Sequence, residues 1–152
     1  MAKALYFTYD GLLDPLGQSQ IVPYVSAISA AGHSLTIVSY EKVERTREQI
    51  KFMEIKLQKI EVNWVRLEFR SGKFWAIKRL ISGALLIRKL CRNLQPDFLH
   101  LRGFVPTVIF QLSRSRLPFL YDFRGFALGE WVDIGKINSS SLTTFRNLRA
   151  TA

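Results

Sequence analysis

The sequence predicts a single α/β domain built on a doubly wound parallel sheet, and three observations support this fold class. Apolar, β-branched and aromatic runs alternate with segments of helical periodicity, in the order strand–helix four times and then a fifth strand. Such alternation is typical of parallel strands with helices on both faces. The length of 152 residues suits one domain, and the 48% apolar content excludes a disordered chain. No linker divides the chain into two domains.

The first strand, loop and helix follow from the N-terminal pattern. Residues 4–9 form a nearly unbroken apolar and aromatic run, which is typical of a strand covered on both faces. Residues 10–20 contain two glycines and a proline, which predicts a loop. Apolar residues then recur at helical spacing over 21–31, with Pro23 in the first turn and Gly32 just past the end.

The same alternation continues along the rest of the chain. In order, the pattern predicts a strand at 34–40, a surface helix at 43–60, a strand at 65–69, a long helix at 74–94, a strand at 98–102, a helix at 105–113, a strand at 119–123 and the start of a helix at 138–148. Apolar and charged residues alternate over 65–69, so we expect this strand near an edge of the sheet. The long helix has one apolar face, formed by Ile77, Ile81, Ala84 or Leu85, Cys91 and Leu94.

Basic residues outnumber acidic residues, which bears on the partners of the chain. Lys and Arg total 22 against 12 Asp and Glu, a formal net charge of +10. This excess predicts attraction to a nucleic acid, a phosphorylated ligand or an acidic membrane surface. No RNP-like, zinc-finger or helix-turn-helix pattern occurs, so we expect no nucleic-acid partner.

Cysteine usage and the length of the apolar runs bear on the compartment. The single cysteine, Cys91, excludes an internal disulfide framework and fits a reducing environment. The longest uncharged apolar run of the basic middle, 80–87, is much shorter than the about 20 residues of a membrane-spanning helix. The N-terminus lacks the apolar length of a signal peptide. We therefore expect a cytoplasmic chain, either soluble or peripheral at the inner face of the plasma membrane.

Open parallel sheets bind ligands at the carboxyl ends of their strands, so the residues after each predicted strand are the candidate site. After the first strand, Gly17 would permit an anion to approach the backbone at a helix N-terminus, with Gln18 and Ser19 as side-chain donors. The Gly11–Gly17 spacing matches neither a dinucleotide-binding loop nor a Walker loop, and an ordinary turn with an N-cap is the alternative. Glu41 follows the second strand.

An Arg-Gly-Phe triplet occurs twice, at the predicted ends of the fourth and fifth strands. The triplets are Arg102-Gly103-Phe104 and Arg124-Gly125-Phe126. If these strands are neighbours, two guanidinium groups point into one crevice and suit a diphosphate or an acidic sugar. The alternative is an ion pair from Arg124 to Asp122 or Glu130, with the glycines serving the turns.

Residues suited to other chemistries are scarce. His33 follows a predicted helix end, where we expect it to decorate a turn, and His100 lies inside an apolar strand. A hydrogen-bonded core histidine is the first interpretation of His100, and a catalytic one is the alternative. Two histidines and one cysteine so far apart make no metal-ligand spacing, and no covalent-nucleophile signature occurs. We therefore predict no metal and no cofactor.

Basic residues without acidic neighbours crowd the long predicted helix. Those that we expect to contact an anionic membrane are Lys73, Lys78, Arg79, Arg88, Lys89 and Arg92. A basic amphipathic helix can lie on an anionic bilayer, where each charge near the surface contributes about 1 kcal/mol. The alternative is a helix whose apolar face packs in the core and whose basic rim is solvated.

Three segments of the chain carry a resemblance to a known family. They are 9–42 (YDGLLDPLGQSQIVPYVSAISAAGHSLTIVSYEK), 96–110 (PDFLHLRGFVPTVIF) and 118–131 (PFLYDFRGFALGEW). These segments resemble the N-terminal domain of the glycogen-synthase-like, family-four glycosyltransferases with the GT-B architecture. The resemblance implies a single Rossmann-like domain at 1–137, on the acceptor side of a retaining enzyme, and the start of an interdomain segment at 138–152. It also implies a nucleotide-sugar donor and a glycan or lipid-linked acceptor, in cell-envelope glycan synthesis.

By position, the resemblance implies that Gly17 and its neighbours approach the donor phosphates, and that Arg102, Asp122 and Arg124 lie beneath the acceptor. The donor site of the family uses a Glu-x7-Glu pair in a C-terminal domain, and no two glutamates here stand eight positions apart. We therefore expect this chain to be inactive alone, with the C-terminal domain missing or supplied by another chain. The alternative is a non-catalytic, membrane-associated Rossmann-like module or a subunit of a split enzyme.

Overall fold

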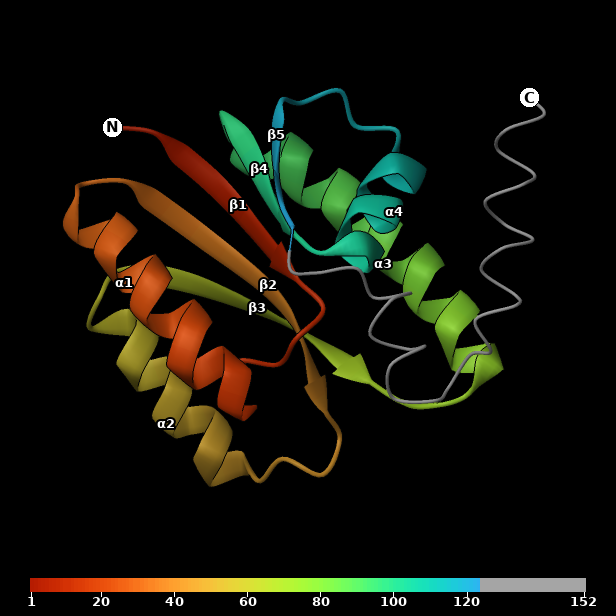
Figure 1. The fold of residues 1–152 in the computed structure, drawn as a ribbon, viewed down its shortest axis with the longest axis horizontal. Coiled ribbons are helices and arrows are strands. Elements are labelled where there is room, and N and C mark those ends of the chain that lie inside the picture. The colour runs from red at the N-terminus through yellow and green to blue at the C-terminus, as the bar shows by residue number, and fades with distance from the viewer. Residues whose placement is uncertain (124–152) are drawn as a thin grey trace.

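The computed structural model of the protein describes residues 1–123. The elements in chain order are β1 (Lys3–Thr8), the short π-helix η1 (Gly17–Ile21), α1 (Val22–Ala30), β2 (Ser34–Lys42), α2 (Arg47–Gln58), β3 (Val62–Phe69), α3 (Lys73–Leu94), β4 (Phe98–Arg102), α4 (Phe104–Ser113) and β5 (Phe119–Asp122) (Figure 1). The predicted helix at 138–148 and the predicted domain boundary at 137 lie outside the described residues.

The strands of residues 1–123 form one parallel sheet in the order β3-β2-β1-β4-β5. This confirms the predicted fold class, a single Rossmann-like α/β domain. The chain adds β2 and β3 on one side of β1, and β4 and β5 on the other, so the strand order reverses between β1 and β4 (Figure 1). The alternating strand β3 lies at an edge of the sheet, as predicted.

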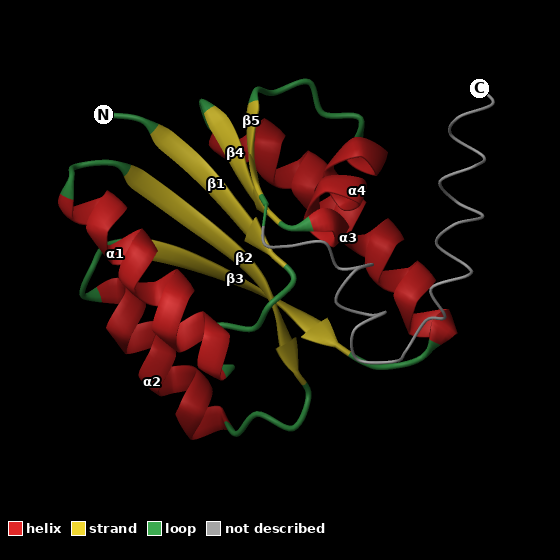
Figure 2. Cartoon of the chain, in the orientation of Figure 1, coloured by secondary structure: helices red, strands yellow, loops and turns green. Residues whose placement is uncertain are grey.

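The helices form a layer on each face of the sheet (Figure 2). Residues of α1 and α2 pack on Tyr6 and Ile37, and residues of α3 and α4 pack on Phe7 and Val38. Successive side chains of a strand point to opposite faces, so the central strand β1 supplies both cores. Burial of these apolar side chains, at about 25 cal/mol per Å², is the main stabilisation of the fold.

The helical segment after β1 begins earlier than predicted, at Gly17 rather than residue 21. Gly17 is buried, and a Cβ there would lie 2.6 Å from the Cα of Leu12. Glycine therefore lets η1 pack directly on the preceding loop, which the glycine and proline content of 10–20 does not reveal. Pro23 lies in the first turn of α1 and Gly32 follows its end with φ +83°, as predicted.

Only part of the apolar face that the sequence suggests for α3 is buried. Ile77, Ile81 and Leu85 are strongly exposed, at 61%, 58% and 63%. Ala84, which the same prediction includes, faces the core with Gly83 and Ile87, and Cys91 packs against the core as a half-buried residue. A Cβ on Gly83 would lie 2.6 Å from the Tyr40 hydroxyl and 3.0 Å from Cγ2 of Ile109, so α3 approaches β2 and α4 through small residues. Within 1–123, no helix has the length and apolar character required to cross a membrane.

Candidate functional site

The carboxyl ends of β1, β4 and β5 meet where the strand order reverses, which is where open α/β sheets bind ligands. The register places Thr8, Arg102 and Asp122 side by side at the ends of these strands. The loop after β1 adds Asp10, and η1 adds Gln20. We call Asp10, Gln20, Arg102 and Asp122 the edge cluster.

Arg102 is the centre of the edge cluster, and its side chain is only 4% exposed. Its Nε lies 3.2 Å from Oδ2 of Asp10, its Nη2 donates to Oε1 of Gln20 at 2.7 Å, and its Nη1 lies 3.7 Å from Oδ2 of Asp122. Burial by itself lowers the pKa of this guanidinium, but Tyr6 and Asp10 outweigh that effect and leave the pKa above its ordinary value. Arg102 is therefore a buried cation held by two carboxylates.

The charge balance of the edge cluster differs from the crevice of two guanidinium groups that the sequence suggested. Two carboxylates surround Arg102, so it brings no free positive charge to the edge. Its expected companion Arg124 lies outside the described residues, as do Gly125 and Glu130. The Asp10 side chain is 43% exposed and presents carboxylate oxygens to solvent. Such an arrangement accepts hydrogen bonds from hydroxyl groups more readily than it binds phosphate.

His100 lies two positions before Arg102 in β4, so its side chain points to the same face of the sheet. Its Nε2 lies 3.5 Å from Oδ2 of Asp122, and its Nδ1 lies 3.5 Å from the hydroxyl of Tyr24. The ring also contacts Tyr6, with centroids 4.5 Å apart. His100 thus joins the polar site to α1. The two-residue spacing to Arg102 is the signal that links it to the edge cluster.

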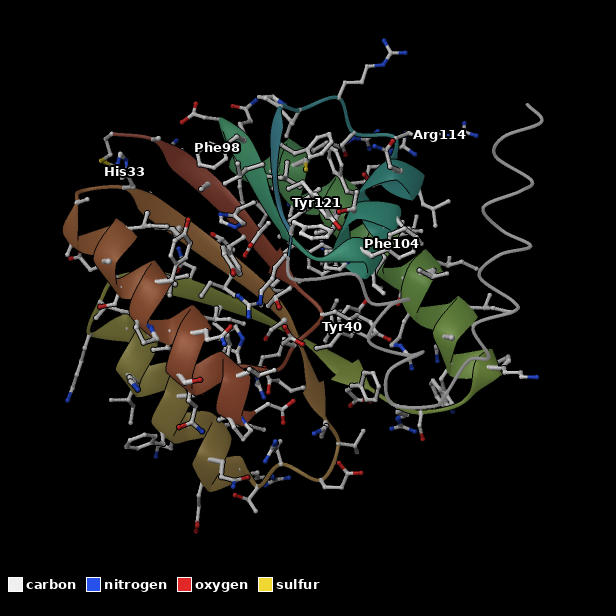
Figure 3. The ribbon with its side chains drawn as sticks, in the orientation of Figure 1. His33, Tyr40, Phe98, Phe104, Arg114 and Tyr121 are labelled. Carbon is white, nitrogen blue, oxygen red and sulfur yellow. The ribbon has the colours of Figure 1, made fainter. Side chains whose placement is uncertain are left out.

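Two hollows lie along this face, and Tyr24 and His100 line both of them. The first, of about 240 Å³, is lined by Tyr24, His100 and residues 120–123, and reaches the edge cluster at Asp122. The second, of about 130 Å³, is lined mainly by apolar side chains and extends to His33 and Phe98 at the amino ends of the strands (Figure 3). An apolar surface therefore adjoins the polar site.

The loop after β1 binds an anion, and that anion is a side chain of the protein itself. Glu41 at the end of β2 is 5% exposed and accepts hydrogen bonds from the backbone N–H of Leu12 at 2.6 Å and of Leu13 at 3.3 Å. The Ser39 hydroxyl donates to the same carboxylate at 2.7 Å, and is held in turn by the indole N–H of Trp64. These loop N–H groups are therefore occupied internally.

The remaining site residues predicted from the sequence are also engaged with nearby backbone. Gln18 donates to the carbonyl oxygen of Leu13 at 3.3 Å, and Ser19 donates to that of Pro15 at 2.7 Å. Gly17 packs against the backbone of the preceding loop, as described above. Gly103 has φ +83°, and its N–H donates to the carbonyl oxygen of Asp122 at 3.0 Å, so it shapes the turn into α4. Gln20, rather than Gln18 or Ser19, contacts Arg102.

One of the basic residues expected at a membrane faces the interior. Arg79 is 9% exposed, and its guanidinium donates to the carbonyl oxygen of Arg70 and lies 4.6 Å from the ring centroid of Phe69. It also lies 5.7 Å from the ring of Tyr9. Aromatic rings and a carbonyl group replace its water, so Arg79 stabilises the packing of α3. The expectation of membrane contact is wrong for this residue.

The described part of the chain contains no set of side chains arranged to bind a metal ion. Among residues 1–123, no group of three or more His, Cys, Asp or Glu side chains is placed to hold a metal ion. His33 accepts a hydrogen bond from the backbone N–H of Ala2 at 3.2 Å, in keeping with its predicted place at a turn.

Comparisons with known proteins support the class of fold. No family model and no curated protein matches the sequence. A glycosyltransferase from Rickettsia africae is similar in structure, with a TM-score of 0.54, 17% identity, and coverage of 79% of this chain and 29% of that chain. The C-terminal domain of the PF1911 hydrogenase from Pyrococcus furiosus gives a TM-score of 0.59, 14% identity, and coverage of 80% and 91%. At these identities the likeness shows the fold alone, and the chain is a Rossmann-like α/β module.

The two similar structures differ in how much of their length this chain accounts for. The chain spans 29% of the length of the glycosyltransferase that it matches, but 91% of the hydrogenase domain. A domain with this fold therefore occurs as part of a larger glycosyltransferase and as a domain of a hydrogenase.

Proposed function

We propose that this chain is the N-terminal, acceptor-side domain of a retaining glycosyltransferase. The enzyme would transfer a sugar from a nucleotide-sugar donor to a glycan or lipid-linked acceptor. The observation that carries the proposal is the edge cluster, a polar site at the point of strand reversal in a Rossmann-like sheet. The match to 29% of a glycosyltransferase supports the proposal, since a single domain of a larger enzyme would give such coverage.

In the proposed role, the carboxylates of the edge cluster recognise hydroxyl groups of the acceptor. Asp10 is partly exposed and accepts hydrogen bonds, and Arg102 holds it in place from below. Gln20, which is exposed, fixes the other side of the guanidinium. The hollow beside Asp122 is lined in part by Leu120, Tyr121 and Phe123, which favours an acceptor with an apolar part, as in a lipid-linked sugar, over a free glycan.

The donor phosphates need a different partner. Transfer of this type requires fixed positive charge and N–H donors at the leaving diphosphate. Among residues 1–123 the N–H groups of Leu12 and Leu13 bind Glu41, and Arg102 is paired with two aspartates. We therefore assign stabilisation of the leaving group to a second domain, and we expect no transfer by this chain alone.

The proposal is tested by NMR titration of the ¹⁵N-labelled chain with a short-chain prenyl-phosphate-linked sugar as the acceptor probe. We expect amide shifts in residues 10–20, 102–103 and 121–123, and about tenfold weaker binding by Asp10→Asn. The matched control is Asp97→Asn. Asp97 accepts a hydrogen bond from the backbone N–H of Lys3 at the amino ends of the strands, opposite to the edge cluster. Shifts confined to that opposite edge, or equal loss of binding in both variants, would contradict the proposed acceptor site.

A turnover assay tests the division of labour between domains. The chain is incubated with the acceptor probe and with UDP-, GDP- or ADP-linked sugars, and product is followed by mass spectrometry. We expect no product above the background without protein. Sustained transfer by the chain alone would show that the donor phosphates are stabilised within it.

A second candidate is a non-catalytic Rossmann-like module or a subunit of a larger assembly. The coverage of 91% of the hydrogenase domain favours it, because a module of this size then acts within another protein. The two candidates differ in the NMR titration, since a non-catalytic module would show no saturable shifts at the edge cluster with any acceptor probe.

A further inference from the structure

The outward face of α3 carries a continuous row of exposed apolar side chains. Its members are Phe74 at 74%, Ile77 at 61%, Ile81 at 58% and Leu85 at 63% exposure. Their spacing of three and four residues places them on one side of the helix. Isolated exposed apolar residues are ordinary on a protein surface, but a contiguous row marks an interaction surface.

Cations continue the same row and border it. Arg88 and Arg92 follow Leu85 at spacings of three and four, and Lys73, Lys78 and Lys89 flank the row. All five of these side chains are exposed, and within residues 1–123 none of them forms an ion pair with an acidic side chain. No acidic residue occurs between Glu68 and Asp97. We call the four apolar and five basic residues the α3 face.

We propose that the α3 face docks on the surface of an anionic lipid bilayer, with α3 lying in the plane of the membrane. Such a surface offers negative headgroups for the five cations and an apolar layer just beneath them for the four large side chains. The Trp75 indole, with the Lys78 ammonium 4.7 Å from its centroid, lies beside the row, and amphipathic rings of this kind favour the headgroup region. This inference does not rest on the proposed function.

Other occupants match only one half of this chemistry. A nucleic acid would neutralise the cations but leave Phe74, Ile77, Ile81 and Leu85 in water. A second copy of the chain would cover the apolar row but bring two sets of five cations together. Residues 124–152 carry four basic and two acidic residues, so they too have the wrong sign of charge.

Docking through α3 leaves the rest of the molecule accessible. The helices α1 and α2 pack on the other face of the sheet, away from α3 (Figure 1). The N-terminus of α3 follows the carboxyl end of β3, so the Phe74 end of the face lies toward the same edge of the sheet as the edge cluster. A bound chain therefore keeps its candidate site near the membrane surface.

The test is co-sedimentation of the 152-residue chain with large unilamellar vesicles. Vesicles of phosphatidylcholine with about one third phosphatidylglycerol are compared with vesicles of phosphatidylcholine alone. We expect binding to the first kind only, and weaker binding as salt rises. Each cation near the surface contributes about a fivefold factor, so Arg88→Gln/Lys89→Gln/Arg92→Gln should weaken binding roughly a hundredfold.

The apolar contribution is tested by Ile81→Asn/Leu85→Asn, which should weaken binding at least tenfold at constant charge. Both sites are exposed, and circular dichroism checks that the thermal midpoint is preserved. The matched controls lie on α2 and at its C-cap. Lys51→Gln/Lys56→Gln/Lys59→Gln removes three exposed charges, and Phe52→Ser removes a side chain that is 68% exposed. Both controls should bind vesicles within about twofold of the unaltered chain.

Several results would overturn the proposal. They are equal binding to neutral vesicles, equal losses in the α2 controls, and an Ile81→Asn/Leu85→Asn variant that binds as the unaltered chain does. The proposal would also fail if light scattering showed that Ile81→Asn/Leu85→Asn converts a dimer to a monomer while vesicle binding stays unchanged. Binding to single-stranded RNA that matches vesicle binding and ignores the apolar variant would assign the face to a nucleic acid instead.

Discussion

Replacing Glu41 with glutamine tests the internal anchor of the loop after β1. The Glu41 carboxylate is buried and accepts three hydrogen bonds, from the N–H groups of Leu12 and Leu13 and from the Ser39 hydroxyl. Glutamine keeps one acceptor oxygen but turns an NH₂ group toward a backbone N–H. A hydrogen bond to a charged group contributes about 1.5–3 kcal/mol, and a buried donor without a partner costs about 1–3 kcal/mol.

The substitution also removes the cost of burying a charge, which offsets part of the loss. We therefore expect Glu41→Gln to lower the free energy of unfolding by about 2 kcal/mol. Equilibrium unfolding in urea measures this change, and the m-value should stay constant. Glu44→Gln is the control, because Glu44 is exposed three positions away and should change stability by less than about 0.5 kcal/mol. A stability loss in Glu41→Gln no larger than in the control, with unshifted Leu12 and Leu13 amide resonances, would refute the anchor.

Three further predictions concern stability. Arg102→Met should lower the free energy of unfolding by about 3 kcal/mol, because the substitution leaves the Asp10 and Asp122 carboxylates without their cation. Unfolding in urea measures this loss, and a loss smaller than that of the exposed control Arg116→Met would contradict the prediction. Gly17→Ala should lower the free energy of unfolding by about 3 kcal/mol, because the new Cβ would meet the backbone of Leu12. Gly32→Ala should lower it by about 1–2 kcal/mol, because Gly32 has open space around it but a φ of +83°. A lower thermal midpoint for Gly32→Ala than for Gly17→Ala would contradict the close packing of the loop. Burial raises the pKa of the Cys91 thiol, against a smaller lowering by its hydrogen bond to Ser115, so the folded state holds this proton more tightly and its stabilisation is lost as pH rises above about 8.5. Unfolding of the chain and of Cys91→Ser between pH 7 and 10 checks this sign, and a stability difference that grows in favour of the chain with rising pH would contradict it.

Most of the fold was predictable because buried parallel strands leave a strong local signal. The strands β1, β2 and β4 are rich in apolar and β-branched residues and are buried on both faces, and the positions of Pro23 and Gly32 bound α1. The start of η1 was missed because the close packing of Gly17 on Leu12 is a tertiary contact. The predicted core face of α3 was wrong at Ile77, Ile81 and Leu85 for a similar reason, since small residues such as Gly83 pack closest although they contribute little to an apolar pattern.

The candidate site was predictable in position but not in its partners. The Arg-Gly-Phe triplet correctly placed Arg102 at the carboxyl edge of the sheet. Asp10 and Gln20, which hold its guanidinium, lie 92 and 82 positions away in sequence, so no local pattern connects them. Glu41 follows the second predicted strand, but its binding of loop N–H groups depends on the register of β2 against β1.

The pairing of Arg102 with two aspartates has a consequence for how the molecule responds to its medium. The one guanidinium of the edge cluster lies 3.2 Å and 3.7 Å from its two carboxylates, and these three groups leave a net charge of only −1, so weak ligands held there by hydroxyl contacts should tolerate physiological electrolyte. The uncompensated cations of α3 have the opposite character. A titration with potassium chloride therefore distinguishes the two surfaces, because rising salt should release ligands bound to the α3 face and leave ligands bound at the edge cluster.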